Sequence, residues 1–107
     1  MIVKLKGKVE SFSEDFIDID CQGVVFRIFV TENLTKKINK IGEFTSLHIF
    51  EIIKEDARLL FGFEENEERE TFSDLLIVQG VGGKMALNIM SKMGIEEIIE
   101  SILKENH

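Results

Sequence analysis

Residues 16–30 read F-I-D-I-D-C-Q-G-V-V-F-R-I-F-V, and this stretch decides the fold class of the first half of the chain. From Phe16 to Cys21, apolar and acidic residues alternate with a period of two, which is typical of a strand with one covered face. Gln22-Gly23 supplies a turn signal. Val24 to Val30 is a second and more continuously apolar strand. The stretch therefore predicts a β-hairpin inside a larger sheet.

The flanking segments repeat this period, with one helical interruption. A long strand is expected over Ile2–Phe12, in which Gly7 indicates a bulge or a sharp bend. The other expected elements are a short helix or helical turn over Asn33–Ile41 that Gly42 ends, a strand over Phe44–Ile53 and a strand over Ala57–Phe63. Five short strands with one helical insert suit a small, closed OB-type β-barrel over residues 1–63. The same pattern is compatible with a fragment of a β-sandwich.

Helical spacing replaces the strand period after Phe63. The acidic run 64–70 favours a helix start, because carboxylates are stabilised near the positive end of a helix dipole. Apolar positions then mark three short helices: Phe72, Leu75, Leu76 and Val78; Ala86, Ile89, Met90 and Met93; and Ile95, Ile98, Ile99, Ile102 and Leu103. Residues 64–107 are thus predicted to form a small helical domain packed on the barrel, and the chain belongs to the α+β class.

Composition and charge narrow the classes of function. The chain has 107 residues and a formal net charge of −7, which argues against a protein that coats nucleic acid through general basicity. Residues 1–63 hold nine Lys/Arg and ten Asp/Glu, whereas residues 64–107 hold four and ten. Any anion-binding surface must therefore be local. No apolar run is long enough for a membrane helix, so a cytoplasmic protein is the default expectation.

Cysteine and histidine usage gives no sign of a metal or cofactor. Cys21 is the single cysteine, so no internal disulfide is possible, and a strand residue is the favoured interpretation. His48 and His107 are far apart in sequence, and His48 lies within an apolar run typical of a strand. We expect no cofactor, no metal site and no catalytic residue.

Residues 78–84 read V-Q-G-V-G-G-K and join the first two predicted helices. The pattern is that of a helix-hairpin-helix turn. Gly80 and Gly82 can adopt positive φ and have no Cβ above the backbone. Backbone N–H groups at the start of the next helix are then expected to face open space, where the dipole favours an anion. Val81 would point inward and lock the two helices together. Lys84 would add a charge to the same bound phosphate.

Such a turn grips a DNA backbone without reading bases. The predicted DNA-binding residues form one continuous run: Gln79, Gly80, Val81, Gly82, Gly83 and Lys84. A plain loop between two helices is the alternative, since glycine is common there. A dinucleotide-binding loop fits poorly, because no strand precedes the turn and the third glycine is misplaced.

Several motifs recur in order along the chain and together resemble the RuvA family. They are Met1-Ile2 with Leu5-x-Gly7, Gly23-Val24, the run K-E-D-A-R-L-L-F-G-F at residues 54–63, Glu68-Arg69-x-x-Phe72, and Gly80-Val81-Gly82-x-Lys84-x-Ala86. The resemblance implies the Holliday-junction-binding subunit of a bacterial branch-migration complex. It implies an OB barrel, a domain with two helix-hairpin-helix motifs, and a linked small domain that contacts the RuvB ATPase.

The resemblance also implies partners and a second group of site residues. Four subunits would form a plate that holds four-way junction DNA open, in company with RuvB and the RuvC resolvase. The subunit itself is expected to be non-catalytic. Glu55 and Asp56 match the family's acidic pin at the crossover, where two carboxylates would repel phosphates. On residue pattern alone, a solvated hairpin tip explains these two acids as well.

Two residues and the length depart from the family pattern. Gln79 stands where the family often has Asn, and Gly83 stands where it often has Pro; Gly83 is expected to loosen the first helical position. The chain stops at His107, where a second hairpin would begin. We therefore expect either an engineered or proteolytic fragment or a truncated gene. A fragment with one hairpin is expected to bind a junction weakly and to leave the ATPase unstimulated.

The residue pattern is compatible with three other functions. A base-excision glycosylase would need a catalytic acid near the hairpin, and Asp74 and Glu96 are the nearest acids, without visible partners. A single-strand-binding OB module would need exposed aromatics, and most of the nine phenylalanines occupy positions expected to face inward. The acidic charge is also compatible with a protein-interaction scaffold that has no role with DNA.

Overall fold

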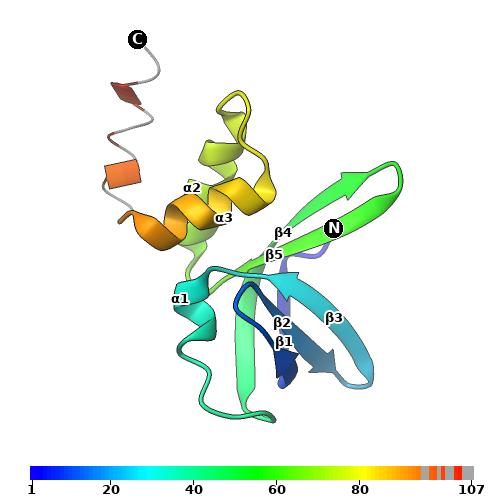
Figure 1. The fold of residues 1–107 in the computed structure, drawn as a ribbon. Coiled ribbons are helices and arrows are strands. Elements are labelled where there is room, and N and C mark those ends of the chain that lie inside the picture. The colour runs from blue at the N-terminus through cyan, green and yellow to red at the C-terminus, as the bar shows by residue number, and fades with distance from the viewer. Residues whose placement is uncertain (95–96, 99, 101–102, 105–107) are drawn as a thin grey trace.

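The first sixty residues form a closed barrel of five strands. The computed structural model describes residues 1–94, 97–98, 100 and 103–104, in which the strands run in the spatial order β1-β2-β3-β5-β4 (Figure 1). Their bounds are β1 Lys4–Phe12, β2 Phe16–Cys21, β3 Val24–Phe29, β4 Phe44–Lys54 and β5 Ala57–Phe63. All neighbours are antiparallel except β3 and β5, which are parallel. The predicted barrel is confirmed, its form is consistent with the OB type, and its closure excludes the sandwich.

Strand β1 bends because it pairs with two neighbours in turn. Its first half, from Lys4 to Lys8, pairs with β4, and its second half, from Lys8 to Phe12, pairs with β2. The irregular register falls between Val9 and Ser11, not at Gly7, where the sequence indicated it. A Cβ on Gly7 would instead collide with the backbone carbonyl of Asp20. Glycine is therefore required there for a close approach of two strands.

Helix α1 is shorter than its apolar spacing predicts. It spans Glu32–Thr35, and the Thr31 hydroxyl accepts the N–H of Leu34 at its start. The Thr35 hydroxyl donates to the carbonyl of Glu32 and to that of Glu14. The next two backbone bonds, from Lys37 to Leu34 and from Ile38 to Thr35, are spaced by three residues. The chain therefore tightens into a turn, and the α-helix does not continue to Ile41.

A bidentate ion pair lies on the outer face of the barrel. Arg27 on β3 donates to both carboxylate oxygens of Asp18, at 2.9 and 3.0 Å, directly across the β2–β3 register. Ser11 on β1 donates to the same carboxylate at 2.7 Å. These hydrogen bonds, that of Arg27 foremost, lower the pKa of Asp18 below its ordinary value. The guanidinium also lies 4.0 Å above the ring of Phe16. The pair thus ties three strands together.

The second half of strand β5, from Leu60 to Phe63, is buried on both faces and belongs to two cores. Leu60 points into the barrel, whereas Phe61 and Phe63 point outward under the helices. Gly62 also faces the barrel interior, where a Cβ would lie only 2.6 Å from Cγ2 of Ile28. The barrel core consists of Val9, Ile17, Ile19, Ile28, Val30, Leu34, Leu47, Ile49 and Leu60. The run L-L-F-G-F therefore encodes a strand with one crowded inner face and one aromatic outer face.

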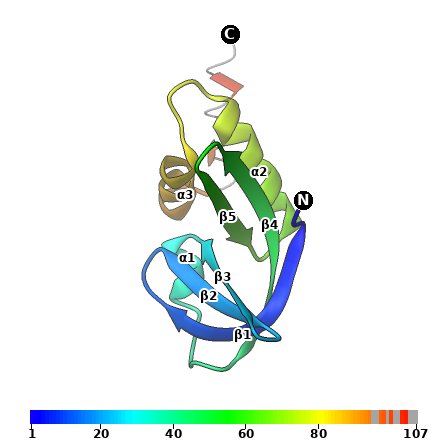
Figure 2. The same cartoon turned by 90° about the vertical axis from the view of Figure 1, so that its right-hand side faces the viewer.

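Two helices cover the outer face of β4 and β5. Helix α2 spans Asn66–Ile77 and helix α3 spans Gly83–Lys92 (Figure 2). The ring of Phe72 on α2 lies among three strand phenylalanines, with centroid distances of 5.3 Å to Phe50, 4.9 Å to Phe61 and 5.1 Å to Phe63. Aromatic pairs at these distances gain stability beyond their buried area. Phe72 is fully buried and anchors the helices to the barrel.

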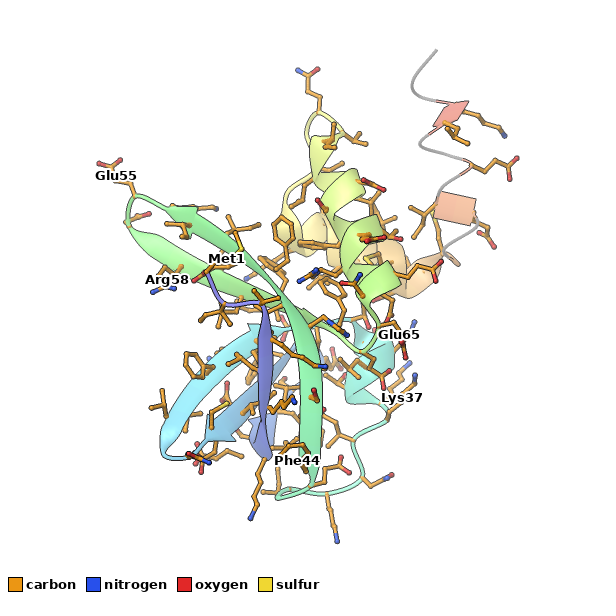
Figure 3. The ribbon with its side chains drawn as sticks, turned by 180° about the vertical axis from the view of Figure 1, so that it is seen from behind. Met1, Lys37, Phe44, Glu55, Arg58 and Glu65 are labelled. Carbon is orange, nitrogen blue, oxygen red and sulfur yellow. The ribbon has the colours of Figure 1, made fainter. Side chains whose placement is uncertain are left out.

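Polar contacts fix the other side of the helical region. The Glu32 N–H donates to the Ser91 hydroxyl, which joins α1 to α3. Lys37 forms an ion pair with Glu64 at 2.9 Å, next to the start of α2 (Figure 3). The Glu68 carboxylate accepts the N–H of Glu65 at that start. The acidic run 64–70 thus begins a helix, in agreement with its pattern.

The third predicted helix is only partly within the described residues. Ile95, Ile99 and Ile102 lie outside them. Ile98 is buried in the second core, and its N–H donates to the carbonyl of Gly94. The division into domains 1–63 and 64–107 stays a prediction, since the second core draws on both segments. Within the described ranges, no helix has the length and apolar character needed to cross a bilayer.

Candidate nucleic-acid interface

The turn between α2 and α3 reverses the chain with few side chains. After Ile77 the backbone becomes extended, and the Val78 N–H still donates to the carbonyl of Leu75. The Val81 N–H then donates to the carbonyl of Val78 at 3.2 Å. Between them, Gly80 has a φ of 85°, in the left-handed region that glycine adopts without steric cost. Gln79 and Gly80 are both exposed at the tip of the turn.

Gly82 has a different role from the one that its spacing predicts. Its φ is −92° and its ψ is 179°, which is extended backbone open to any residue, so Gly82 does not use the positive φ that glycine allows. It is the N-cap of α3, and its carbonyl accepts the first helical N–H, that of Ala86, at 2.9 Å. No described atom lies within 4 Å of a Cβ built on it. The glycine therefore leaves open space above the helix start.

The N-terminus of α3 has no side-chain cap among the described residues. The first N–H groups of an α-helix have no partner within the helix, and a cap side chain usually accepts one of them. Gly82 has no side-chain atom that could accept one of these hydrogen bonds. The bare amides and the positive end of the dipole together favour a negatively charged oxygen at this point.

Gly83 is required by packing. It is the first residue of α3, and a Cβ there would collide with Cζ of Phe61 and lie 2.9 Å from its Cε1. The Phe61 ring is fully buried between Phe29 and Phe72, so it has little room to move. The sequence comparison with proline did not indicate this packing role of Gly83. Its missing side chain lets α3 approach the barrel.

Two apolar residues hold the turn against the second core. Val81 is partly buried and packs on that core, while Ala86, one turn further along α3, is fully buried. The core consists of Phe61, Phe63, Phe72, Leu75, Ala86, Leu87, Met90 and Ile98. The exposed tip of the turn is thus connected on both sides to residues that pack in the second core.

Lys84 is exposed at the start of α3 and points toward the barrel. Its Nζ lies 4.8 Å from the ring centroid of Phe29, within the range of a cation–π interaction. The same side chain lines an open groove with three acids of the barrel and α1, namely Glu14, Asp15 and Glu32. These acids were missed from the sequence, because they lie about fifty to seventy positions away from Lys84 along the chain. They weaken the attraction that Lys84 exerts on an anion.

Glu55 and Asp56 form the two-residue turn of the β4–β5 hairpin. The last register pair is Lys54 with Ala57, and both acids are exposed. Neither carboxylate has an ion-pair partner in the part of the chain that the structure describes. The hairpin projects from the molecule with Glu55 at its tip (Figure 3). The hairpin and the α2–α3 turn lie in the same half of the molecule, on the far side from β1–β3 (Figures 1 and 2).

Among the described residues, those considered for other functions form no cluster. Asp74 is exposed on α2, and Glu96 lies outside the described residues. Among the phenylalanines, Phe44 is 67% exposed and Phe12 is 40% exposed, while the others are half-buried or buried. Within the described ranges, no group of three His, Cys, Asp or Glu residues could hold a metal ion. Cys21 is half-buried, and burial raises the pKa of its thiol.

Comparison with known proteins decides the family. The model of the RuvA N-terminal domain matches residues 1–62 of this sequence. The chain belongs to the RuvA family. It is 39% identical over 102 residues to a protein of Methylobacterium radiotolerans, 37% identical to one of Caldanaerobacter subterraneus and 34% identical to one of Pseudomonas putida. Each of these is named Holliday junction branch migration complex subunit RuvA.

The RuvA match covers almost all of this chain but only part of its relatives. The aligned segment is 95% of the chain, and it is 50%, 54% and 50% of the three relatives, respectively. The chain therefore spans about half the length of the curated RuvA proteins that it matches.

The contact between Gly83 and Phe61 gives a testable prediction. We expect Gly83→Ala to lower the free energy of unfolding by about 1–3 kcal/mol, because the added methyl group must displace a buried ring. Urea denaturation followed by circular dichroism measures this change. Gly94→Ala is the matched control, because a Cβ at Gly94 meets no described atom within 4 Å. Equal stability of the two variants would contradict the packing role of Gly83.

Proposed function

We propose that this chain is a non-catalytic, structure-specific DNA-binding part of a RuvA subunit, which holds four-way junctions without reading their sequence. The observation that carries the proposal is the uncapped start of α3 behind a turn that has no side chain at Gly80 or Gly82. The names of the relatives support the same class of DNA.

In this proposal the α2–α3 turn acts as a helix-hairpin-helix motif. A phosphate oxygen of one junction arm would accept hydrogen bonds from the first N–H groups of α3, and Gly82 would allow the DNA backbone to come close. Hydrogen bonds to a charged acceptor are stronger than neutral ones. Gln79 and Val81 shape the turn, and Gly83 seats the helix. Every nucleotide has a phosphate, so the contact is independent of sequence.

Lys84 would supply a charge to the same strand of DNA. Its present position above Phe29 and beside three acids implies that the side chain swings outward when a phosphate arrives. A cation–π contact at an exposed site contributes only about 0.5–1 kcal/mol, so this movement costs little.

Glu55 and Asp56 would act by repulsion at the junction centre. Their exposed carboxylates lie at the tip of a projecting hairpin and lack ion-pair partners among the described residues. A phosphate near them is destabilised, whereas a phosphate at the α2–α3 turn is stabilised. That contrast favours strands that separate at the centre while the arms stay bound.

The assembly and its partners belong to the same proposal. We assign residues 1–63 to the OB barrel and 64–107 to a helix-hairpin-helix domain, of which one hairpin lies in this chain. A homotetramer would place four copies around one junction and would increase affinity through multivalency. The RuvB ATPase would drive branch migration as a separate protein, RuvC would act on the same junction, and all of these would work in the cytoplasm.

Lys84→Ala tests the phosphate contact. We expect weaker binding to junctions of any sequence and a salt slope shallower by about one unit of log K per log salt, because fewer counterions are released. Fluorescence anisotropy on a four-way junction at several salt concentrations measures both effects. Lys92→Ala is the control, because Lys92 is exposed at the other end of α3 and carries the same charge. Identical slopes for both variants would count against a role of Lys84.

Neutralising the hairpin tip tests the repulsion. The double variant Glu55→Gln with Asp56→Asn is expected to bind a four-way junction several-fold more tightly, since two like charges are removed beside phosphates. The gain should shrink at high salt. Titration of labelled junction and of linear duplex separates an effect at the centre from a general charge effect. Weaker junction binding by the double variant would refute the repulsive role.

A further inference from the structure

A buried carboxylate lies at the base of the acidic hairpin. The Glu51 side chain is only 2% exposed, although Glu51 sits on β4 close to the projecting part of the hairpin. Its Oε2 accepts hydrogen bonds from Nε and from Nη2 of Arg58, the former at 2.8 Å. Its Oε1 accepts the backbone N–H of Ile2 at 3.2 Å. Three donors from two other segments therefore converge on one buried anion.

The carboxylate connects the hairpin to the start of the chain. Arg58 is on β5, one residue after the strand leaves the turn, and Ile2 precedes β1. A backbone hydrogen bond from Ile49 to the carbonyl of Val3, at 2.8 Å, fixes the same N-terminal segment on β4. Met1 and Arg58 lie near one another beside the hairpin, and Glu55 lies at its tip (Figure 3).

On the face of the hairpin that carries Glu51, the outer part of the two strands has little other packing among the described residues. Ile53 is 70% exposed, and its register partner across the strands is Arg58 itself. Phe50, Ile52 and Leu59 pack on the second core from the opposite face of the same two strands. A two-stranded ribbon that projects from a barrel is only marginally stable by itself. The ion pair is therefore placed where a brace on the uncovered face is needed.

We propose that Glu51 is a positioning residue, which clamps Arg58 and the N-terminal backbone so that Glu55 and Asp56 are presented at a fixed place. This inference rests on the proposed function, because it gives the hairpin tip its orientation toward the junction centre. Glu51 itself touches no DNA. Its effect passes through the strand that carries the two acids.

The chemistry of the contact requires a carboxylate. All three groups around Glu51 are donors, and an ionised carboxylate is an acceptor at both oxygens. The hydrogen bonds of Arg58, and then that of Ile2, lower the pKa of Glu51 below its ordinary value, so the anion persists at neutral pH. Glutamine has the same shape, but it would turn an NH₂ group toward a donor.

Amide hydrogen exchange on the free protein tests the brace without DNA. In Glu51→Gln we expect the amides of residues 52–59 to exchange about tenfold faster, which corresponds to the loss of a hydrogen bond to a charged group. Amides of β2 should keep their rates. Glu10→Gln is the control, since Glu10 is exposed on β1 and the change removes the same charge. Arg58→Gln, which removes an exposed partner, serves as a second variant and should give the same pattern.

A junction labelled with 2-aminopurine at the crossover then tests the placement of the tip. We expect Glu51→Gln to bind with nearly wild-type affinity but to give less unstacking signal at saturation. Unchanged exchange in both variants would overturn the proposal, and so would faster exchange with a full unstacking signal. If the wild-type chain bound no junction, the proposed function would fail, and exchange alone would decide whether Glu51 braces the hairpin.

Discussion

One strand with two buried faces determines the rest of this molecule. In β5 the inner face must be narrow, so Gly62 lies where Ile28 and Leu47 leave no room for a Cβ. The outer face must be wide, so Phe61 and Phe63 extend under α2 and α3. Because neighbouring residues of a strand point to opposite sides, the order F-G-F satisfies both demands at once. The barrel and the helices are thereby parts of one packed structure.

The position of the turn follows from this strand. The Phe61 ring reaches the start of α3, and α3 can lie against it only because residue 83 lacks a side chain. The same strand, seven residues long, continues back to the acidic turn at Glu55 and Asp56. A bare helix start and a projecting pair of carboxylates are therefore connected by a single strand, whose inner end is packed in both cores and whose outer end depends on the contacts of Glu51 and Arg58. In the proposed function, phosphates are bound at one place and repelled at another, so a fixed separation between the two is a physical requirement.

Sequence patterns predicted those elements that depend on local periodicity. Strands Phe16–Cys21 and Ala57–Phe63 have the predicted bounds, because alternation and turn residues define them without reference to the rest of the chain. The helix at Glu32 is shorter than its apolar spacing predicts, because the backbone hydrogen bonds after Thr35 are spaced by three residues, which an apolar spacing does not register. The sequence did not separate the roles of Gly80 and Gly82, since a glycine that leaves open space looks the same in sequence as one that adopts positive φ.

Contacts between distant residues could not be predicted from spacing. The contact of Gly83 with Phe61 and the acids beside Lys84 depend on how the helices dock. For Glu51 the sequence does contain a signal that could have been used. It is a lone carboxylate inside the apolar run H-I-F-E-I-I, with Arg58 seven positions later. Such a residue on a covered strand needs a partner. A two-residue turn at Glu55 and Asp56 places Leu60 directly opposite Glu51 and Arg58 diagonally opposite it on the same face, so the spacing could have indicated the brace.

The most direct test adds a cap to the bare start of α3. Gly82 has extended backbone and open space, so Gly82→Ser should fold normally and gain a hydroxyl that accepts an α3 N–H in place of a phosphate. We predict unchanged or slightly higher stability and junction affinity lower by about tenfold, while Gly94→Ser, at an exposed glycine with equal space, binds as the wild type does. Wild-type junction affinity in Gly82→Ser would contradict phosphate binding by these amides.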